Sequence, residues 1–414
     1  MSLSTDPITA LNEAKKYLTV NKIADIMGVG ERQVYNYLNG KSEPSKIRMN
    51  VLRNHLEKGN NAISTFTMID LFAGIGGIRK GFEGVGGKCI YTSEWNKFSV
   101  QTYKANFPDD HEINGDITDV EAKDIPDHDV LLAGFPCQPF SLAGVSKKNS
   151  MGVKHGFEDK TQGTLFFDVC RIIAEKKPKA FLLENVKNLV SHDKGNTFKV
   201  IKEALIKLGY HIEFKVISAE PWVPQKRQRI FIVGFKDTDQ FDFDQVLVPD
   251  TTPTLASILH QPDEEPEEGY TEIYRCKTRV LPKFTLSDNL WNYLQGHAAK
   301  HAKKGNGFGC NVVGPEDVAR TLSARYYKDG SEILVKQKGK NPRMLTPREC
   351  SRLQGFDRPK NKPIKIPVSN CQAWKQFGNA VAVPVIEAIA NAMKPHIEGS
   401  FTGKKSKLKS KLKA

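Results

Sequence analysis

Apolar and polar positions follow one pattern through most of the chain. Short apolar runs, each ending in a turn or a charged residue, lie at 67–74, 88–95, 129–134 and 180–186. Helical patterns alternate with them at 98–106, 165–175 and 197–208. This alternation predicts an α/β fold with a doubly wound, mostly parallel sheet. In such sheets ligands bind at the carboxyl ends of the strands.

The pattern changes further along the chain. Apolar runs at 211–218 and 229–235 are close enough to form an antiparallel pair at one edge of the sheet. The proline-rich acidic segment 262–269 predicts a hinge, and residues 270–345 show little periodicity, which is typical of a smaller, irregular domain. An isolated helical pattern at 372–393 predicts a helix that packs back on the sheet.

Residues 1–62 have helical spacing throughout. Apolar Ile23 and Met27 precede the glycine turn 28–30, and a second helix at 31–40 follows it. Two short helices around such a turn resemble a helix-turn-helix of the repressor type. The second helix would present Arg32, Gln33 and Asn36 outward, and these side chains bind phosphates and base edges.

These shifts predict five parts of the chain. They are a helix-turn-helix module at 1–62, a catalytic domain at 63–255, a target-recognition domain at 256–345, a return to the catalytic domain at 346–395 and a disordered basic tail at 396–414.

Charge and composition narrow the class of protein. The formal net charge is +14 and the isoelectric point about 9.2, which favours a polyanionic partner such as nucleic acid. No stretch has the apolar length of a membrane span and the N-terminus has no signal core, so we expect a cytoplasmic protein with no membrane partner. The seven cysteines are scattered without a CxxC pair, which argues against disulfides and a zinc site.

Four features at successive strand ends predict an adenosyl site. The loop of Gly74, Gly76 and Gly77 lets the backbone approach a ligand, but position 79, where a dinucleotide fingerprint needs glycine, is arginine. Glu94 is placed to accept hydrogen bonds from two ribose hydroxyls, and Trp95 to stack on adenine. Asp116 follows the next strand and suits the adenine amino group.

A second set of residues predicts nucleophilic chemistry. Cys137 lies between two prolines directly after the 129–134 run, where its thiol would face the crevice. A lone cysteine is usually a small core residue, so it needs partners. Glu184 is the first of the three residues that end the next run, and Arg227 and Arg229 lie just ahead of the edge strand. They supply a carboxyl acid and cations for the same pocket.

These residues stand in seven motifs that resemble the DNA cytosine-5 methyltransferases. The motifs are FAGIGG, SEW, GDI, GFPCQ, ENV, QKRQR and KQFGNAV, in this order within 65–395. The resemblance implies the S-adenosylmethionine-dependent methyltransferase fold. It also implies a cofactor site made of Phe72, Gly74, Ile75, Gly76, Gly77, Glu94, Trp95, Asp116, Ile117, Leu165, Asn379 and Val381. Around the target cytosine it implies Cys137, Glu184, Arg227 and Arg229.

The resemblance also implies a substrate. Attack of the Cys137 thiolate on cytosine C6 makes C5 nucleophilic, and this requires a base flipped out of double-stranded DNA. The segment 142–163 is a candidate lid. Segments at 281–291, 305–309 and 319–334 resemble the subgroup that methylates CCWGG or CCNGG sites. The predicted DNA contacts are Gln138, Arg320, Ser323, Arg325 and Tyr326.

Three alternatives stay open at this point. An RNA cytosine methylase, for instance one acting on tRNA, would need neither a helix-turn-helix nor a DNA-recognition domain. An amino methyltransferase would carry a Pro-Pro-Tyr-type motif, and no Pro-Pro pair occurs in the sequence. A transcriptional regulator is compatible with residues 1–62, as a second role beside methylation that represses the protein's own promoter. The main expectation is the methyltransferase of a restriction-modification system, with a cognate endonuclease as functional partner.

Overall fold

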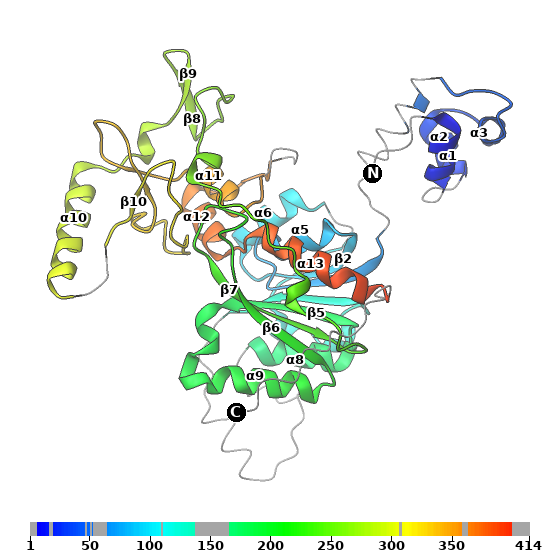
Figure 1. Cartoon of the computed structure of the whole chain (residues 1–414), viewed down its shortest axis with the longest axis horizontal. Helices are drawn as coiled ribbons and strands as arrows, with labels where there is room; N and C mark the ends of the chain where they lie inside the picture. The colour runs from blue at the N-terminus through cyan, green and yellow to red at the C-terminus, as the bar shows by residue number, and fades with distance from the viewer. Residues whose placement is uncertain are drawn as a thin grey trace, which may run out of the picture. The chain divides into compact units, whose positions relative to one another are not determined.

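The protein was described from a computed structural model. The structure describes residues 6–15, 20–45, 48–49, 52, 64–108, 111–136, 165–305, 309–357 and 363–399. The chain forms two compact units, Met1–Thr65 and Phe66–Ala414 (Figure 1). The predicted boundary after residue 62 lies close to this division. The second unit is not divided further, so the separate recognition domain at 256–345 stays a prediction.

The first unit contains three described helices, α1 (Pro7–Lys15), α2 (Val20–Met27) and α3 (Glu31–Leu38). Gly28, at φ +61°, turns the chain between α2 and α3. Apolar side chains that recur at helical spacing are buried in one core: Ile23, Ala24 and Met27 from α2, Val34 and Tyr37 from α3, with Met49 and Leu52. The two helices and the glycine turn therefore form where the sequence predicts them.

A seven-stranded sheet organises the second unit, in the order β3-β2-β1-β4-β5-β7-β6. Its strands are β1 (Phe66–Leu71), β2 (Gly87–Ser93), β3 (Ile113–Asn114), β4 (Val130–Gly134), β5 (Ala180–Val186), β6 (His211–Ser218) and β7 (Gln228–Phe235). The first five strands in this order pair in parallel, and β7 is antiparallel to both β5 and β6. The mostly parallel sheet and the antiparallel edge pair are both confirmed.

Helices cover both faces of this sheet (Figure 1). One apolar core joins the strands to α5 (Gly77–Glu83) and α13 (Val383–Ile397), and another joins them to α8 (Leu165–Lys176) and α9 (Asn196–Lys207). Central strands buried on both faces need continuous apolar runs, and β4 shows this with four consecutive buried residues. A further helix, α6 (Lys97–Asn106), follows β2.

The C-terminal return consists of two helices where the sequence pattern predicted one. α12 (Asn370–Asn379) ends before residues 380–382, and α13 begins with Pro384 in its first turn. α13 packs closely on α5, because a Cβ at Gly81 would meet Ile386 Cγ2 at 2.6 Å. The return to the first sheet is therefore confirmed, and the break between the helices brings Asn379 to the strand ends.

The region after β7 is more regular than its sequence pattern predicts. Its elements are β8 (Thr271–Tyr274), β9 (Lys277–Val280), α10 (Asp288–Lys303), β10 (Val312–Val313), β11 (Leu334–Val335), β12 (Arg343–Met344) and α11 (Pro347–Leu353). The helical pattern of α10 is weak because Leu294 is its one fully buried described residue. The prediction of a hinge at 262–269 is wrong, because Glu264 and Glu267 form ion pairs with Arg352 and Arg348 of α11.

Short 3₁₀ helices complete the described secondary structure, at Ile117–Asp119, Ala122–Asp124, Lys187–Val190, His192–Gly195, Phe243–Gln245, Leu255–Ser257 and Pro282–Phe284. Among the described residues, no helix has the length and apolar character needed to cross a membrane.

A buried acid lies behind the carboxyl end of β1. Asp70 is 1% exposed and accepts a hydrogen bond from the Tyr103 hydroxyl at 3.2 Å. Arg79 in turn donates to the Tyr103 hydroxyl at 3.0 Å. Burial raises the pKa of Asp70 to about 8, although the charge of Arg79 opposes the shift. The folded protein therefore favours the protonated acid.

We expect Asp70→Asn to change how stability depends on pH. A carboxyl whose pKa is raised on folding contributes stability below its unfolded value near 4, and this contribution is lost as the pH rises through about 8. Asparagine removes the titration. The difference in free energy of unfolding, variant minus wild type, should therefore increase by roughly 2–5 kcal/mol between pH 4 and pH 8. Urea denaturation at each pH measures it.

Asp129→Asn is the matched control, because the pKa of Asp129 is shifted in the opposite direction to that of Asp70. Burial of Asp129 is outweighed by hydrogen bonds from Lys179 and Thr67, so its pKa is lowered. That stabilising contribution is present at neutral pH and is lost as the pH falls. Parallel pH profiles of Asp70→Asn and the wild type would contradict the assignment of Asp70.

Candidate active site

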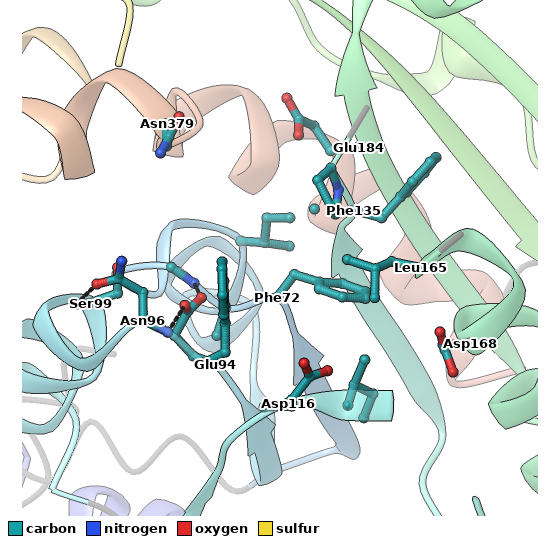
Figure 2. Close-up of a pocket in the computed structure, with 18 of the residues that line it drawn as sticks. Phe72, Glu94, Asn96, Ser99, Asp116, Phe135, Leu165, Asp168, Glu184 and Asn379 are labelled. Atoms are coloured by element: carbon teal, nitrogen blue, oxygen red, sulfur yellow. Dashed lines mark hydrogen bonds between the residues drawn. The ribbon is translucent and has the colours of Figure 1, made fainter. Parts of the chain in front are cut away.

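A cleft of about 1640 Å³ opens at the carboxyl ends of β1, β2, β4 and β5. It is larger than the roughly 300–1,000 Å³ of a typical single-ligand pocket, so it has room for two ligands. The predicted site residues that line it are Phe72, Gly74, Gly77, Glu94, Trp95, Asp116, Ile117, Leu165, Glu184, Arg229, Asn379 and Val381. Figure 2 shows Glu94 and Asp116 on one side of the Phe72 ring and Glu184 apart from them, beside Phe135.

The loop after β1 forms one wall of the cleft. Phe72 has φ +53° and Gly74 has φ +57°, and the backbone N–H of Gly74 donates to Glu94 Oε2 at 2.7 Å. Two predicted cofactor residues of this loop do not line the cleft. Ile75 is buried in the apolar core that includes Phe377, and Gly76 must be glycine because a Cβ would meet the Phe107 ring at 2.2 Å. The packing accounts for the residue type at both positions, and their predicted contact with the cofactor stays a prediction.

Glu94 and Asp116 keep acceptor positions that face the cleft. Glu94 accepts backbone hydrogen bonds from Gly74 and, at 2.8 Å, from Asn96. Burial raises the pKa of Glu94, and these bonds oppose the shift. Asp116 receives its two hydrogen bonds, from Thr118 N and Oγ1, on Oδ1, and thus Oδ2 can accept from a ligand. Trp95 is 75% exposed beside them, where its ring can stack on a ligand.

Glu184 and Arg229 form an ion pair across two strands. Glu184 lies near the carboxyl end of β5, paired with Gly134 of β4, and Arg229 Nε lies 3.0 Å from Glu184 Oε1. Burial raises the pKa of Glu184, while Arg229 and then Arg227 oppose the shift. The neighbouring Asn185 donates to the carbonyl of Phe135 at 2.9 Å, which ties the end of β5 to the turn after β4. An acid with a raised pKa thus faces the cleft beside a fixed cation.

Arg227 has a different place from the one predicted. It is 1% exposed, does not line the cleft, and donates to the carbonyls of Leu322 at 2.9 Å, Gly378 at 3.0 Å and Ala380. Burial lowers the pKa of Arg227 to about 9, so it stays charged at neutral pH. The predicted contact of Arg227 with the cytosine is therefore wrong. Arg227 is a positioning residue that holds the segments at Leu322 and at Gly378 against the start of β7.

Two backbones meet directly beside this guanidinium. A Cβ at Gly378 would lie 2.2 Å from the carbonyl oxygen of Ser323, far inside contact distance. No side chain fits at this position, so glycine is required there. The contact places the segment around Ser323 against the loop that carries Asn379.

The predicted DNA contacts in this region divide into two kinds. The prediction for Tyr326 is wrong, because its side chain is fully buried and its hydroxyl donates to the carbonyl of Ile333 at 2.7 Å. Ser323 is half-buried and its hydroxyl donates to Glu332. Arg320 and Arg325 are exposed, and Arg320 donates to the carbonyl of Gly309 at 3.2 Å. The two arginines remain predicted DNA contacts.

The cleft also contains residues that the sequence did not single out. These are Asn96, Ser99, Gly115, Phe135, Asp168, Gln372, Lys375, Gln376 and Ala380, among others. Gln376 accepts from Thr102 Oγ1 at 3.0 Å, and its buried Nε2 has no hydrogen-bond partner among the described residues. Because Gln376 belongs to the KQFGNAV motif, the sequence could have indicated it as a residue of the cleft. Asp168 carries no such signal, because it is one of several acids at helix starts.

Cys137 and Gln138 lie outside the described residues, as do the candidate lid at 142–163 and residues 400–414 of the predicted tail. The predicted start of the disordered tail at residue 396 is wrong, because His396 and Ile397 are buried residues of α13. The described chain reaches Pro136, which lines the cleft.

The family model described as C-5 cytosine-specific DNA methylase matches residues 66–395. The chain belongs to this family. The assignment favours a DNA enzyme over the RNA methylase and the amino methyltransferase considered above, and it agrees with a cleft that has room for a cofactor and a base.

Relatives with curated functions support the same activity. The chain is 46% identical over 386 residues to a DNA-cytosine methyltransferase of Escherichia coli K12, which covers 80% of this chain and 78% of the relative. It is 45% identical to the Type II methyltransferase M1.ScrFI of Lactococcus lactis subsp. cremoris, covering 92% and 93% of the two chains. With M.SsoII of Shigella sonnei the identity is 44%, covering 93% and 97%. The last two matches cover more of the chain than residues 66–414 alone make up, so they extend into the first unit.

Solved structures share the fold at low sequence identity. The S. pombe Dnmt2 methyltransferase superposes with a TM-score of 0.57 at 17% identity, covering 80% of this chain and 98% of that one. The Entamoeba histolytica methyltransferase EhMeth gives a TM-score of 0.55 at 18% identity, covering 80% and 97%. The second unit therefore has the fold of S-adenosylmethionine-dependent methyltransferases.

We expect Arg227→Met to destabilise the methyltransferase strongly. The substitution keeps an apolar stem but removes the donors to three carbonyls, at least two of which lie in buried surroundings. Breaking a buried charged network costs about 3–5 kcal/mol, which chemical denaturation would measure. Arg229→Met is the control, because Glu184 can take up a proton when its partner is lost, and we expect a loss of under about 2 kcal/mol. Equal losses in the two variants would contradict the positional role of Arg227.

Proposed function

We propose that the protein transfers a methyl group from S-adenosylmethionine to C5 of a cytosine flipped out of double-stranded DNA, with Cys137 as the covalent nucleophile. The observation that carries the proposal is the pairing of Glu184 with Arg229, across the cleft from Glu94, Asp116 and Phe72. This arrangement offers one half of the cleft to an adenosyl group and the other half to a pyrimidine.

The donor set fits the cofactor. Glu94 retains carboxylate lone pairs for the ribose hydroxyls, Asp116 Oδ2 suits the adenine amino group, and Trp95 offers an exposed ring for stacking. S-adenosylmethionine supplies the methyl group on a positively charged sulfur. Phe72 and Leu165 supply apolar walls between the two halves of the cleft. The cleft presents the Glu94 carboxylate for a sugar, and the loop after β1 lacks the third glycine of a pyrophosphate-binding fingerprint.

The pyrimidine half supports covalent catalysis. The Cys137 thiolate forms a bond to C6, and the ring electrons that this releases make C5 the nucleophile for the methyl group. Glu184, whose pKa is raised by burial, shares a proton with N3 and so stabilises the charge that develops on the ring. Arg229 holds the O2 oxygen. A base then removes the C5 proton, the C5–C6 double bond forms again and the thiolate leaves.

The target site is proposed to be CCWGG or CCNGG. The segments at 281–291, 305–309 and 319–334 support this by resemblance, and exposed Arg320 and Arg325 are the side chains we assign to DNA contact. Two of the relatives are named Type II methyltransferases. We therefore propose that the protein protects DNA within a restriction-modification system, with a cognate endonuclease as its functional partner.

A regulatory role is proposed for the first unit. It has its own apolar core, and α3 follows α2 after a glycine turn as in repressor-type modules. Arg32 is exposed and Asn36 half-exposed on α3, while Gln33 donates to Ser42 Oγ at 3.0 Å and is partly engaged. We propose that this unit binds promoter DNA of the protein's own gene.

We expect Cys137→Ser to abolish methyl transfer, because serine is not deprotonated at neutral pH and the bond to C6 does not form. Expression in a host free of methylation, followed by sequencing with 5-methylcytosine detection, measures both the activity and its site. The wild type should mark cytosine within CCWGG or CCNGG, and the variant should mark none. Marks in unrelated sequences would contradict the proposed target.

Two binding measurements separate the nucleophile from the cofactor site. Duplex DNA with 5-fluorocytosine at the target should trap the wild type covalently, since fluorine blocks the final elimination, and should not trap Cys137→Ser. Isothermal titration should show that Cys137→Ser binds S-adenosylmethionine as the wild type does. Trp95→Ala should show the reverse, a weaker affinity with the nucleophile intact. Turnover by the serine variant would end the covalent proposal.

We expect Arg32→Ala combined with Asn36→Ala to weaken binding of the upstream promoter region by roughly tenfold or more, because polar contacts from one helix are lost. Methylation should be unchanged. A gel-shift titration beside a methylation assay measures both. The control is Lys15→Ala with Asn12→Ala, which likewise removes one cation and one asparagine from exposed positions of α1. Equal promoter binding by the two double variants would leave the first unit without this role.

A further inference from the structure

The hairpin of β8 and β9 has an exposed tip of mixed aromatic and basic character. Tyr274 pairs with Lys277 in the ladder, which leaves a two-residue turn of Arg275 and Cys276. Tyr274 is 44% exposed, and the guanidinium groups of Arg275 and Arg279 lie 5.2 and 3.6 Å from its ring centre. The side chains of the turn are thus presented outward from the second unit.

The turn keeps these side chains at an unfavourable backbone conformation. Arg275 has φ +50° and Cys276 has φ +58°, so both residues lie in the left-handed region. Two-residue hairpin turns of this kind ordinarily contain Asn-Gly, because other residues are strained there. A turn that served only to reverse the chain would be more stable with Asn-Gly. The sequence therefore keeps Arg275 and Cys276 at this tip although the turn conformation favours Asn-Gly.

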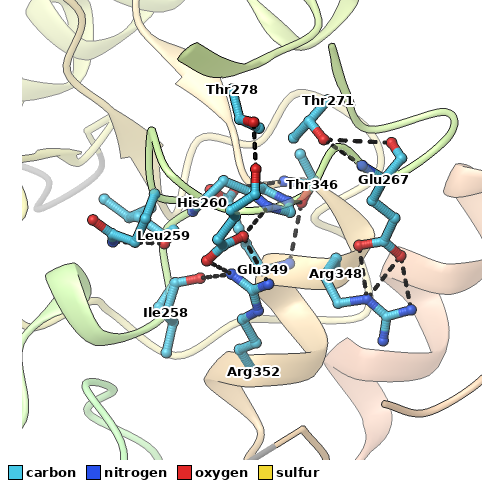
Figure 3. Close-up of polar contacts among 12 residues, drawn as sticks. Ile258, Leu259, His260, Glu267, Thr271, Thr278, Thr346, Arg348, Glu349 and Arg352 are labelled. Atoms are coloured by element: carbon cyan, nitrogen blue, oxygen red, sulfur yellow. Dashed lines mark hydrogen bonds and ion pairs between the residues drawn. The ribbon is translucent and has the colours of Figure 1, made fainter. Parts of the chain in front are cut away.

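The base of the hairpin is held rigidly (Figure 3). Thr278 N donates to the carbonyl of Pro262 at 2.8 Å, its hydroxyl donates to the carbonyl of Glu264, and Glu267 N donates to Thr271 Oγ1 at 2.7 Å. These bonds tie both strands of the hairpin to the acidic segment 262–269.

That segment is in turn attached to α11 by a set of charged contacts, which we name the clamp: His260, Glu264, Glu267, Arg348, Glu349 and Arg352. Arg352 Nη1 lies 3.0 Å from Glu264 Oε1 and Arg348 Nη2 lies 2.8 Å from Glu267 Oε1. His260 joins Glu264 at 3.0 Å on Nδ1 and Thr346 at 3.1 Å on Nε2. Glu264 and Glu267 are thus used within the clamp, whereas Asp263, Glu265 and Glu268 of the same segment are exposed.

We propose that the β8–β9 hairpin is a DNA-backbone arm, in which Arg275 and Lys277 bind phosphates of the duplex outside the cleft. The inference rests on the proposed DNA substrate. Three features support it: a positive tip whose one acid, Glu272, is paired with Arg279 at 2.8 Å, side chains kept at a strained turn, and a rigid base. Duplex DNA is the occupant that matches this charge, and a positioned arm fixes the register of the enzyme on it.

The main test replaces the tip with the turn that the backbone prefers. The full-length variant Arg275→Asn, Cys276→Gly, Lys277→Ala removes two cations and relieves the strain, so its melting temperature should equal or exceed that of the wild type. Its affinity for a target duplex, measured by fluorescence anisotropy between 50 and 200 mM salt, should fall by about tenfold at the lower concentration. The slope of log Kd against log salt should become shallower by roughly 0.9 for each lost phosphate contact.

Two further variants keep the test decisive. Lys277→Ala alone leaves the turn unchanged and should reduce the slope by about half as much as the triple variant. Lys199→Ala with Lys207→Ala removes the same charge from exposed positions of α9, on a face of the sheet that α8 also covers, and should bind nearly as the wild type does.

The outcomes are distinct. If the wild type methylates and binds DNA but the hairpin variants bind like the α9 control, the arm is overturned and the proposed function stands, and the tip would then suit a protein partner. If the wild type binds no duplex DNA, the proposed function fails and the arm fails with it. A shallower slope confined to the hairpin variants supports the arm.

Discussion

The buried guanidinium of Arg227 is the interaction on which the geometry of the cleft depends. A charge removed from water is tolerated only when hydrogen bonds compensate for the lost solvation, and here three carbonyls from two distant segments accept from its two terminal nitrogens. One segment carries Asn379 to the cleft and the other carries the exposed Arg320 and Arg325. Arg229 lies two residues further along the chain, in β7. Fixing Arg227 therefore also fixes the cation that faces Glu184.

The two acids of the cleft show how similar burial produces different groups. Burial raises the pKa of both Glu94 and Glu184. At Glu94 the rise in pKa is opposed by backbone N–H donors. These donors hold both carboxylate oxygens in place for a neutral polar ligand. At Glu184 the rise in pKa is opposed by the charges of Arg229 and Arg227, so the protonation of Glu184 depends on what occupies the pocket beside it. The first arrangement suits recognition and the second suits proton sharing during a reaction.

The strand ends could be predicted from the sequence because local rules determine them. Central strands need continuous apolar runs, and acids or glycines directly after such runs fall at one edge of a parallel sheet. The place of Arg227 could not be predicted, since its acceptors lie far away in the sequence and are backbone atoms common to every residue. Tyr326 was misplaced for a related reason, because an aromatic ring with a hydroxyl suits both a surface and a core. α10 was missed because it buries too few side chains to show a helical period.

The direct meeting of the Gly378 and Ser323 backbones has a consequence for how such enzymes acquire new target sites. Exchange of a recognition region between relatives is a natural route to new specificity, yet here the proposed recognition region shares a backbone contact with the loop at Asn379. A chimaera must therefore inherit the path of the chain at 322–324 together with the glycine opposite it. Recombination within this contact would separate the two loops, whereas the variable parts beyond it are open to exchange. The contact marks an inner limit to modularity in this fold.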